Sequence, residues 1–183
     1  MSNIQALPIG NAGQATEVLD SIKQKIGMVP NIYATIAHSP AALKVFLGFG
    51  EALAGGVLSA SLREQIALTV AGENGCDYCA SAHTAVAKGT GLSAEEAARN
   101  LVGTASDPRI AAILNFSKAV VSKRGWLDDG ELEQLRSAGI TDQEIVEIIA
   151  TVAVNLFTNY FNHIAGTDID FPVVNTDRDR HAA

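Results

Sequence analysis

The chain has 183 residues, with 13 Lys or Arg against 20 Asp or Glu, so its formal net charge is -7 at pH 7. This length suits one domain, or at most a compact pair of similar halves, and the acidic balance argues against nucleic acid and anionic membranes as partners. Because the N-terminus has no basic segment followed by an apolar one, and no later apolar run reaches about 18 residues without a polar interruption, we expect a cytoplasmic protein.

Helical periodicity and capping signals predict an all-α chain in which no segment alternates convincingly as a strand. Residues 1–13 look like an extended lead-in. The helices expected before the central region cover residues 15–26, 29–38 and 40–54. Gly27 is placed to end the first of them, and Ser39-Pro40 opens the third with an N-cap followed by proline at the first helical position.

The central region, residues 61–91, predicts a helical hairpin. Ser61 begins a Ser-x-x-Glu pattern that is typical of a capped helix start. Asn74-Gly75 is a stop signal, and a second helix follows from about Cys76. The chain is therefore expected to reverse its direction between the two helices.

This hairpin gathers four side chains with useful chemistry. Glu64 lies about 15 Å back from the reversal and His83 about 12 Å beyond it, so the two side chains are expected to face each other at nearly the same level. Cys76, Cys79 and His83 recur at i, i+3 and i+7, which places them on one face of the second helix. A carboxylate, an imidazole and both of the chain's cysteines then converge on one cleft.

The second half is expected to hold helices over residues 93–102, 108–123, 129–137 and 145–164. Thr141 and Glu144 form a capping box ahead of the longest of these. Its centre is apolar nearly all round, which predicts a helix that is buried within the chain or between the subunits of a homo-oligomer. Residues 167–183 form an extended tail, in which Phe171 and Val173 could dock on a neighbouring subunit.

The two halves echo each other faintly. Glu64 and His83 have the same separation as Glu144 and His163 in the last helix, but the later interval contains no cysteine. The sequences of the two stretches are otherwise dissimilar, so the echo indicates at most an old and degenerate duplication. Because only the first stretch contains cysteines, we expect one redox site per chain.

The pattern Glu64-x11-Cys76-x2-Cys79-x3-His83 resembles the active-site signature of the alkylhydroperoxidase D family, within the wider carboxymuconolactone decarboxylase-like group. The resemblance implies an all-helical bundle, a homo-oligomer such as a trimer or hexamer, and reduction of organic hydroperoxides by the cysteine pair. It also implies that no bound cofactor or metal is needed, and that a dithiol reductant, such as a lipoyl or thioredoxin-like protein, resets the pair. The peroxidase pattern has a histidine where this chain has Tyr78, whose phenol is a poor base at neutral pH, so we expect a shorter proton relay or a weaker activity.

The candidate catalytic residues are Cys79, Cys76, His83 and Glu64. His83 lies one helical turn from Cys79, so we expect it to activate Cys79 as the thiol that attacks the peroxide. Glu64 would orient the imidazole, although its place three residues after Ser61 also fits a helix cap. Cys76, near the expected exposed start of its helix, would resolve the sulfenic acid and meet the reductant.

Two other functions stay open at the level of sequence. Cys76, Cys79 and His83 could supply three ligands to a zinc ion with an open fourth position. A lactone decarboxylase or isomerase would instead use His83 or Glu64 as a base.

Two further polar features are undecided by the sequence. Tyr78 points away from the cysteine face at helical spacing, which favours packing over catalysis. Asn155, Asn159 and His163 belong to a polar cluster late in the long apolar helix, where they border either the cleft or an interface.

Overall fold

The structure is a computed structural model that describes residues 2–176, and these residues form helices and no strand. The elements are η1 (Gly13–Ala15), α1 (Thr16–Ile26), α2 (Asn31–Ile36), α3 (Pro40–Ala54), α4 (Ala60–Asn74), α5 (Asp77–Gly89), α6 (Ala94–Leu101), α7 (Pro108–Ser122), α8 (Asp129–Ser137) and α9 (Asp142–Ala165). The all-α fold class is therefore confirmed, and each expected helix is present with its bounds shifted by a few residues.

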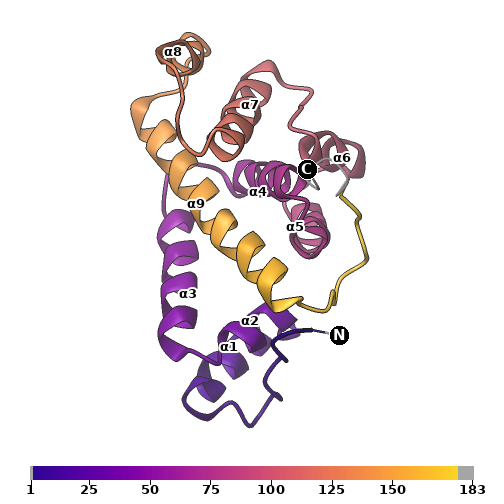
Figure 1. Ribbon diagram of the computed structural model, residues 1–183. Helices are drawn as coiled ribbons and strands as arrows, with labels where there is room; N and C mark the ends of the chain where they lie inside the picture. The colour runs from indigo at the N-terminus through magenta and orange to yellow at the C-terminus, as the bar shows by residue number, and fades with distance from the viewer. Residues whose placement is uncertain (1, 177–183) are drawn as a thin grey trace.

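The bundle is built around α4, which packs against α5, α6, α7 and α9 (Figure 1). α9 crosses the molecule beside α3, with α1 and α2 at one end and α7 and α8 at the other. Residues of α4 such as Ile66, Leu68 and Val70 are completely buried, because neighbouring helices cover α4 on several sides. The α4–α5 pair thus lies at the centre of the fold, where its side chains are held by packing on both helices.

The reversal between α4 and α5 occurs at Gly75, which adopts a left-handed conformation with φ of 66°. Glycine is the residue best suited to this conformation, since it has no Cβ to clash with the following carbonyl. The backbone N–H of Cys76 then donates to the carbonyl of Ala71 at 2.9 Å, which closes the end of α4. Cys76 is the N-cap of α5, so the second helix starts where the sequence predicts.

The start of α4 differs from the expectation. Ser59, and not Ser61, is the N-cap: its backbone is extended, and its hydroxyl accepts a hydrogen bond from the Leu62 N–H at 3.2 Å. Because α4 begins at Ala60, Glu64 lies beyond the first turn and cannot close a capping box. The interpretation of Glu64 as a helix cap is therefore wrong, and its carboxylate is available for another partner.

α9 begins with the predicted capping box, in which Thr141 and Glu144 satisfy each other's backbone N–H groups. It is the one helix among residues 2–176 that is long and apolar enough to cross a membrane by length and composition. Its contacts with α3, α4, α5 and α7 make it a central helix of the bundle. Within the chain α9 is not buried all round, however, since Val146 and Ile164 are 66% and 70% exposed.

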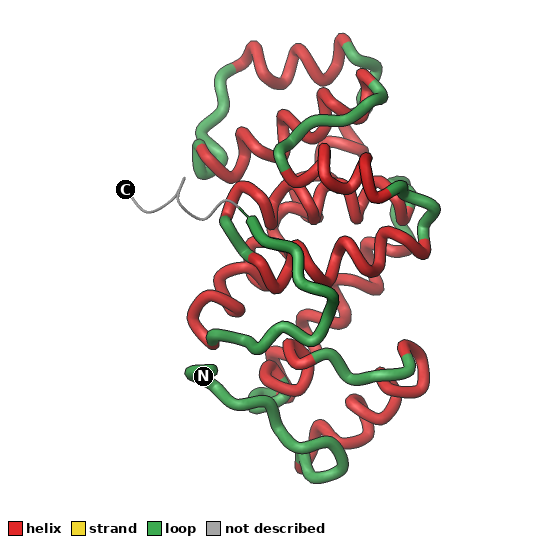
Figure 2. The backbone as a smooth tube through the Cα atoms, turned by 90° about the vertical axis from the view of Figure 1, so that its right-hand side faces the viewer, coloured by secondary structure: helices red, strands yellow, loops and turns green. Residues whose placement is uncertain are grey.

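The segment after α9 is extended, as expected, but it packs on its own chain. It leaves α9 and runs back across α5 (Figure 2). The Val174 N–H donates to the Ser81 hydroxyl at 2.9 Å, and the ring of Phe171 meets Tyr78 edge-on with 6.0 Å between the ring centroids. Phe171 therefore docks within the chain rather than on a neighbour, while Val173 remains exposed. The predicted tail residues 177–183 lie outside the described residues.

The equal spacing of Glu64–His83 and Glu144–His163 does not produce two similar sites in the structure. Glu144 lies in the first turn of α9 and His163 near its end, with no reversal between them. A continuous helix of this length holds the two side chains about 28 Å apart. Only the first pair, Glu64 and His83, is therefore brought together by the fold.

A close helix crossing supports the α4–α5 hairpin from behind. A Cβ atom at Gly72 of α4 would overlap the backbone carbonyl of Leu101 in α6. We predict that Gly72→Ala lowers the free energy of unfolding by at least about 2 kcal/mol, because backbone must move to admit the methyl group. Gly89→Ala is the matched control, since no atom lies within 4 Å of that Cβ position. Denaturant unfolding measures both, and an unchanged midpoint for Gly72→Ala would contradict the predicted crossing.

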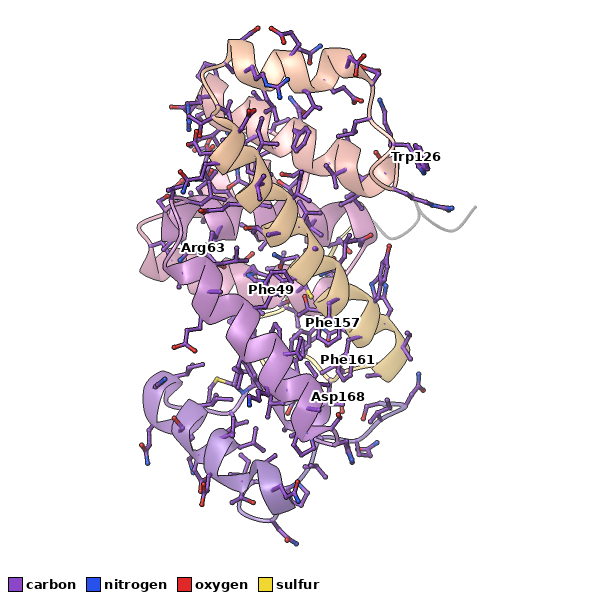
Figure 3. All side chains as sticks on the ribbon, turned by 90° about the vertical axis from the view of Figure 1, so that its left-hand side faces the viewer. Phe49, Arg63, Trp126, Phe157, Phe161 and Asp168 are labelled. Carbon is purple, nitrogen blue, oxygen red and sulfur yellow. The ribbon has the colours of Figure 1, made fainter. Side chains whose placement is uncertain are left out.

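The apolar exposure of α3 and α9 bears on assembly. Figure 3 shows Phe49, Phe157 and Phe161 where these helices lie side by side, and Val45 of α3 and Ile164 of α9 are strongly exposed. Monomeric proteins rarely expose contiguous apolar patches of this kind, so the homo-oligomer stays our prediction. Sedimentation at micromolar concentration is expected to give a trimer or hexamer, and Val45→Glu is expected to shift it toward the monomer. A monomeric parent protein would refute the prediction.

Candidate active site

Glu64 and His83 form the contact that the hairpin geometry predicts. The Glu64 carboxylate, from the middle of α4, lies 2.8 Å from Nδ1 of His83, in the second turn of α5. Their side chains are 17% and 25% exposed, so the pair is largely shielded from water. A carboxylate in this position fixes the tautomer and the orientation of the ring.

The charge on His83 is set by two opposing effects. Burial lowers the pKa of His83, but the negative charge and hydrogen bond of Glu64 act in the other direction, with help from a hydrogen bond to Asn155. The net result is a pKa raised above the ordinary value for histidine. The imidazole is therefore held in its protonated form over more of the neutral range than a free histidine would be.

Cys79 lies in a polar niche formed by α9. Its sulfur accepts a hydrogen bond from the Asn162 side-chain N–H at 3.2 Å, and the Thr158 hydroxyl lies 3.9 Å away. The hydrogen bond from Cys76 is the largest influence on the pKa of Cys79 and lowers it; burial opposes this, and Asn162, Thr158 and Asn159 lower it further. Hydrogen bonds to the charged form thus favour a Cys79 thiolate.

Cys76 behaves in the opposite way. Its hydrogen bond to Cys79 and its burial raise the pKa of Cys76, although an interaction with His163 works against the rise. The expected exposed helix start is wrong, because Cys76 is only 1% exposed. Both cysteines are reduced in this structure. Of the two thiols, Cys79 is therefore the favoured site for negative charge.

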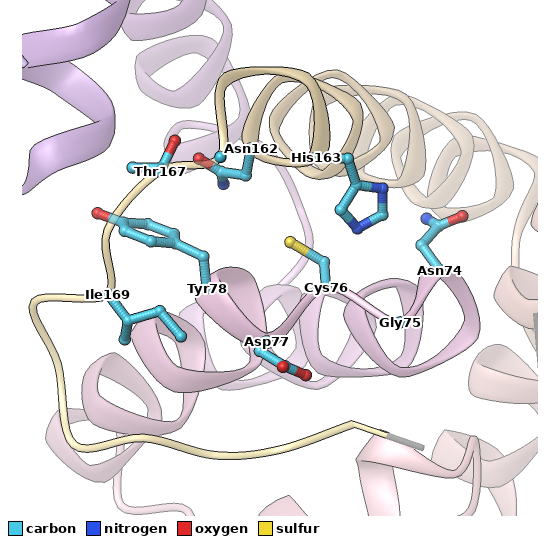
Figure 4. A pocket seen from close by; sticks show the side chains of 10 residues that line it. Asn74, Gly75, Cys76, Asp77, Tyr78, Asn162, His163, Thr167 and Ile169 are labelled. Atoms are coloured by element: carbon cyan, nitrogen blue, oxygen red, sulfur yellow. The ribbon is translucent and has the colours of Figure 1, made fainter. Parts of the chain in front are cut away.

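The two thiols border different cavities. Cys79 and His83 line a small cavity of about 140 Å³ whose walls are almost entirely apolar and include Phe46, Phe171 and Val86. Cys76 lines a larger cleft of about 590 Å³ between the start of α5 and the end of α9, together with Asn162 and His163 (Figure 4). Of the residues that form these walls, Tyr78 alone borders both cavities.

Comparison with solved structures places this geometry among known folds. The chain is similar to the alkylhydroperoxidase D core of an uncharacterized peroxidase-related protein from Ralstonia eutropha JMP134, with 26% identity over 91% of this chain and 93% of that one and a TM-score of 0.82. An uncharacterized peroxidase-related protein from Silicibacter sp. TM1040 has 24% identity over 91% and 92% of the chains and a TM-score of 0.80. A complex of a variant of the debrominase Bmp8 with 2,3,4-tribromopyrrole has 21% identity over 93% and 92%, with a TM-score of 0.79.

The sequence pattern of the carboxymuconolactone decarboxylase family matches residues 40–122, from α3 to α7, which include the whole hairpin. The matched segment and the solved structures show that the chain resembles the alkylhydroperoxidase D-like, carboxymuconolactone decarboxylase-like family. No curated protein sequence matches it. The resemblance supports a peroxidase-related or decarboxylase-like role for this enzyme-like fold.

Tyr78 takes part in packing, as its helical position predicts for this alkylhydroperoxidase D-like chain. Its hydroxyl donates to the Asp170 carboxylate at 2.9 Å and accepts a hydrogen bond from the Ile32 N–H at 3.2 Å. Burial is the main cause that raises the pKa of Tyr78, and the negative charge of Asp170 adds to it. A phenol with a raised pKa cannot serve as a base near neutral pH, so Tyr78 fastens the tail to α5 and α2.

The zinc alternative has no support in the geometry. Among residues 2–176, no group of three or more His, Cys, Asp or Glu side chains is placed to hold a metal ion. Nδ1 of His83 is already engaged by Glu64, and the two sulfurs open on different cavities.

The polar residues of α9 are the part of the site that the sequence leaves undecided. Asn162 and Thr158 contact Cys79, and the Asn159 carboxamide accepts a hydrogen bond from Asn74 at 2.9 Å. The cluster therefore borders the cleft. The sequence does contain a signal for this contact: three amide or hydroxyl side chains lie on the buried face of an apolar helix, where each needs a hydrogen-bond partner. The expectation that His83 is the base for Cys79 stays a prediction, since Cys79 takes its hydrogen bonds from α9 and Cys76.

We predict that Glu64→Gln lowers the pKa of His83, because glutamine keeps the shape of the side chain and removes its charge. The parent pKa is raised above the unfolded value, so the pair adds stability fully below about pH 6.5 and loses this contribution as pH rises through the folded pKa. The variant is therefore expected to lose on the order of 1 kcal/mol at pH 6 and less at alkaline pH.

NMR titration of the His83 ring and unfolding at several pH values measure these effects. Glu95→Gln, which alters an exposed pair with Arg99, is the control and is expected to leave the His83 titration unchanged. An unaltered His83 pKa in Glu64→Gln would contradict the electrostatic coupling.

Proposed function

We propose that the chain is a thiol-dependent, peroxidase-like oxidoreductase that reduces organic hydroperoxides in the cytoplasm with electrons from a dithiol reductant. The observation that carries the proposal is the unequal thiol pair. The Cys79 thiolate is favoured by hydrogen bonds and faces an apolar cavity, while Cys76 keeps a proton beside it. A low-pKa thiolate next to a second thiol is the arrangement that sulfenic acid chemistry needs.

In the first step, the Cys79 thiolate attacks the terminal oxygen of the hydroperoxide. The O–O bond breaks, sulfur is oxidised to sulfenic acid, and the organic group leaves as an alkoxide. His83 borders the same cavity and is held protonated by Glu64, so it can give the alkoxide the proton that turns it into an alcohol. The apolar walls suit the organic part of the substrate and keep bulk water from the reacting atoms.

In the second step, Cys76 loses its proton and attacks the Cys79 sulfur. The S–O bond breaks, hydroxide combines with the released proton as water, and an intramolecular disulfide forms. A dithiol then reduces this disulfide by two exchange reactions and is itself oxidised to a disulfide. Cys76 is the N-cap of α5 and Cys79 lies three residues later in its first turn, a spacing that permits a short-range disulfide.

The decarboxylase-like alternative would use the Glu64–His83 pair as its base. It leaves the Cys76–Cys79 hydrogen bond and the thiolate-stabilising contacts of Asn162 without a role. No specific contact of the site favours it over the peroxidase proposal.

The direct test is to count free thiols before and after one equivalent of cumene hydroperoxide. The proposal expects the loss of both thiols as an intramolecular disulfide, and their return with a dithiol reductant. Unchanged thiols would contradict it and favour a decarboxylase-like role.

Single serine variants assign the two thiols. We predict that Cys76→Ser, treated with hydroperoxide and a sulfenic acid trap, is labelled once at Cys79, because Cys79 alone is favoured as a thiolate. Cys79→Ser is expected to stay unlabelled, since burial still raises the pKa of Cys76 when the hydrogen bond to Cys79, the larger cause, is gone. Mass spectrometry of the trapped peptides measures both. Labelling of Cys76 in the Cys79→Ser protein at the parental rate would reverse the assignment.

A further inference from the structure

The large cleft at Cys76 is a second candidate binding site, which has no part in the peroxide step. It is about 590 Å³ in volume, and Cys76 contributes to its wall while Cys79 does not. Asn162 and Thr167 also line it, and each has a buried oxygen, Oδ1 and Oγ1 respectively, with no hydrogen-bond partner among residues 2–176. These residues are only 5% and 9% exposed. Buried polar atoms without partners on a cavity wall indicate a place for a ligand with polar groups.

His163 completes this cleft. It lies in the last turn of α9, and its imidazole points into the cleft beside the sulfur of Cys76 (Figure 4). The side chain is exposed, so it can exchange protons with solvent. The direct influence of His163 on the Cys76 thiol agrees with this placement. His83, in contrast, faces the small apolar cavity on the Cys79 side.

We propose that His163 is the acid–base residue for Cys76, and that the cleft around it admits the dithiol reductant, on the opposite side of the cysteine pair from the peroxide cavity. The inference rests on the proposed function and adds a second histidine with a separate task. His83 would serve the oxidising step at Cys79, and His163 the closing and reopening of the disulfide at Cys76.

The chemistry of the disulfide gives His163 its two roles. When the disulfide forms, His163 accepts the Cys76 proton, the Cys76 sulfur attacks the Cys79 sulfenic acid, and the leaving hydroxide takes this proton from His163 and departs as water. When the disulfide is reduced, a thiolate of the reductant attacks Cys76 and the Cys79 thiolate leaves. The second thiol of the reductant then displaces Cys76, to which protonated His163 returns a proton.

Attack at Cys76 is also the favourable direction for this exchange. A thiol with a lower pKa is the better leaving group, and the hydrogen bonds from α9 lower the pKa of Cys79. The Cys79 cavity of about 140 Å³ is small and nearly apolar, whereas the cleft is larger and has the polar residues Asn162 and Thr167 in its wall. The volume and polarity of the cleft and the order of the leaving groups thus all favour attack by the reductant at Cys76.

The first experiment separates the two steps in the His163→Ala variant. Stopped-flow measurement with a sulfenic acid trap is expected to give a parental rate of Cys79 oxidation, and disulfide closure slowed roughly tenfold or more. Imidazole added to the buffer is expected to restore closure, because the cleft has room for it. His38→Ala, which changes a histidine bonded to the Gln5 carbonyl, is the control. Closure at the parental rate, or a slowed closure that imidazole does not restore, would overturn the role of His163.

The second experiment measures the reset alone, and so distinguishes failure of the inference from failure of the proposed function. Protein oxidised with diamide contains the disulfide without any hydroperoxide, and its reduction by dithiothreitol is followed by thiol release. His163→Ala is expected to slow this reduction, and Thr167→Val to slow it by roughly two- to tenfold through one lost hydrogen bond. Unchanged reduction in both variants would overturn the inference. If both variants slow the reduction as expected but the parent protein does not react with hydroperoxide, the cleft assignment stands. Only the peroxidase proposal is then refuted.

Discussion

The left-handed turn at Gly75 is the constraint on which the site depends. It reverses the chain between α4 and α5, so that Glu64 and His83 meet although they lie far apart in sequence. The same turn makes Cys76 the N-cap of α5 and sets both thiols at the positive end of a helix. The close crossing of α4 and α6 at Gly72 supports the hairpin from behind. Two glycines, one for conformation and one for space, therefore position every candidate catalytic group.

Contacts from α9 make the two thiols chemically different. Both cysteines are buried and both lie near the start of α5, so neither burial nor the helix dipole separates them clearly. The difference comes from α9, where the Asn162 N–H donates a hydrogen bond to the Cys79 sulfur and the Thr158 hydroxyl lies 3.9 Å from it. With these contacts Cys79 is the better site for negative charge, and Cys76 becomes the hydrogen-bond donor. In the proposed mechanism, this difference makes Cys79 react first and Cys76 second.

The features that were predictable from the sequence are those with local causes. The Gly75 stop, the proline-started α3 and α7, and the opposition of Glu64 and His83 follow from capping residues and helical rise. The cap at Ser59 was missed because two serines lie two residues apart, and only the backbone conformation decides which of them caps. The contacts of Cys79 could not be predicted, since they depend on how α9 rotates against α5.

The polar side chains of α9 also explain why this helix is both central and incompletely buried. One face carries Asn155, Thr158 and Asn162 toward the site, and another packs through Ile148 and Val152 into the core beside α4 and α7. A helix has only about 100° of arc for each such face, so the remaining apolar residues, including Ile164, must point outward. If a second subunit covers that outward face, it also fixes the end of α9 where His163 lies. Assembly and the environment of Cys76 would then be coupled through one rigid helix, because displacement of its last turn would move His163 relative to the thiol.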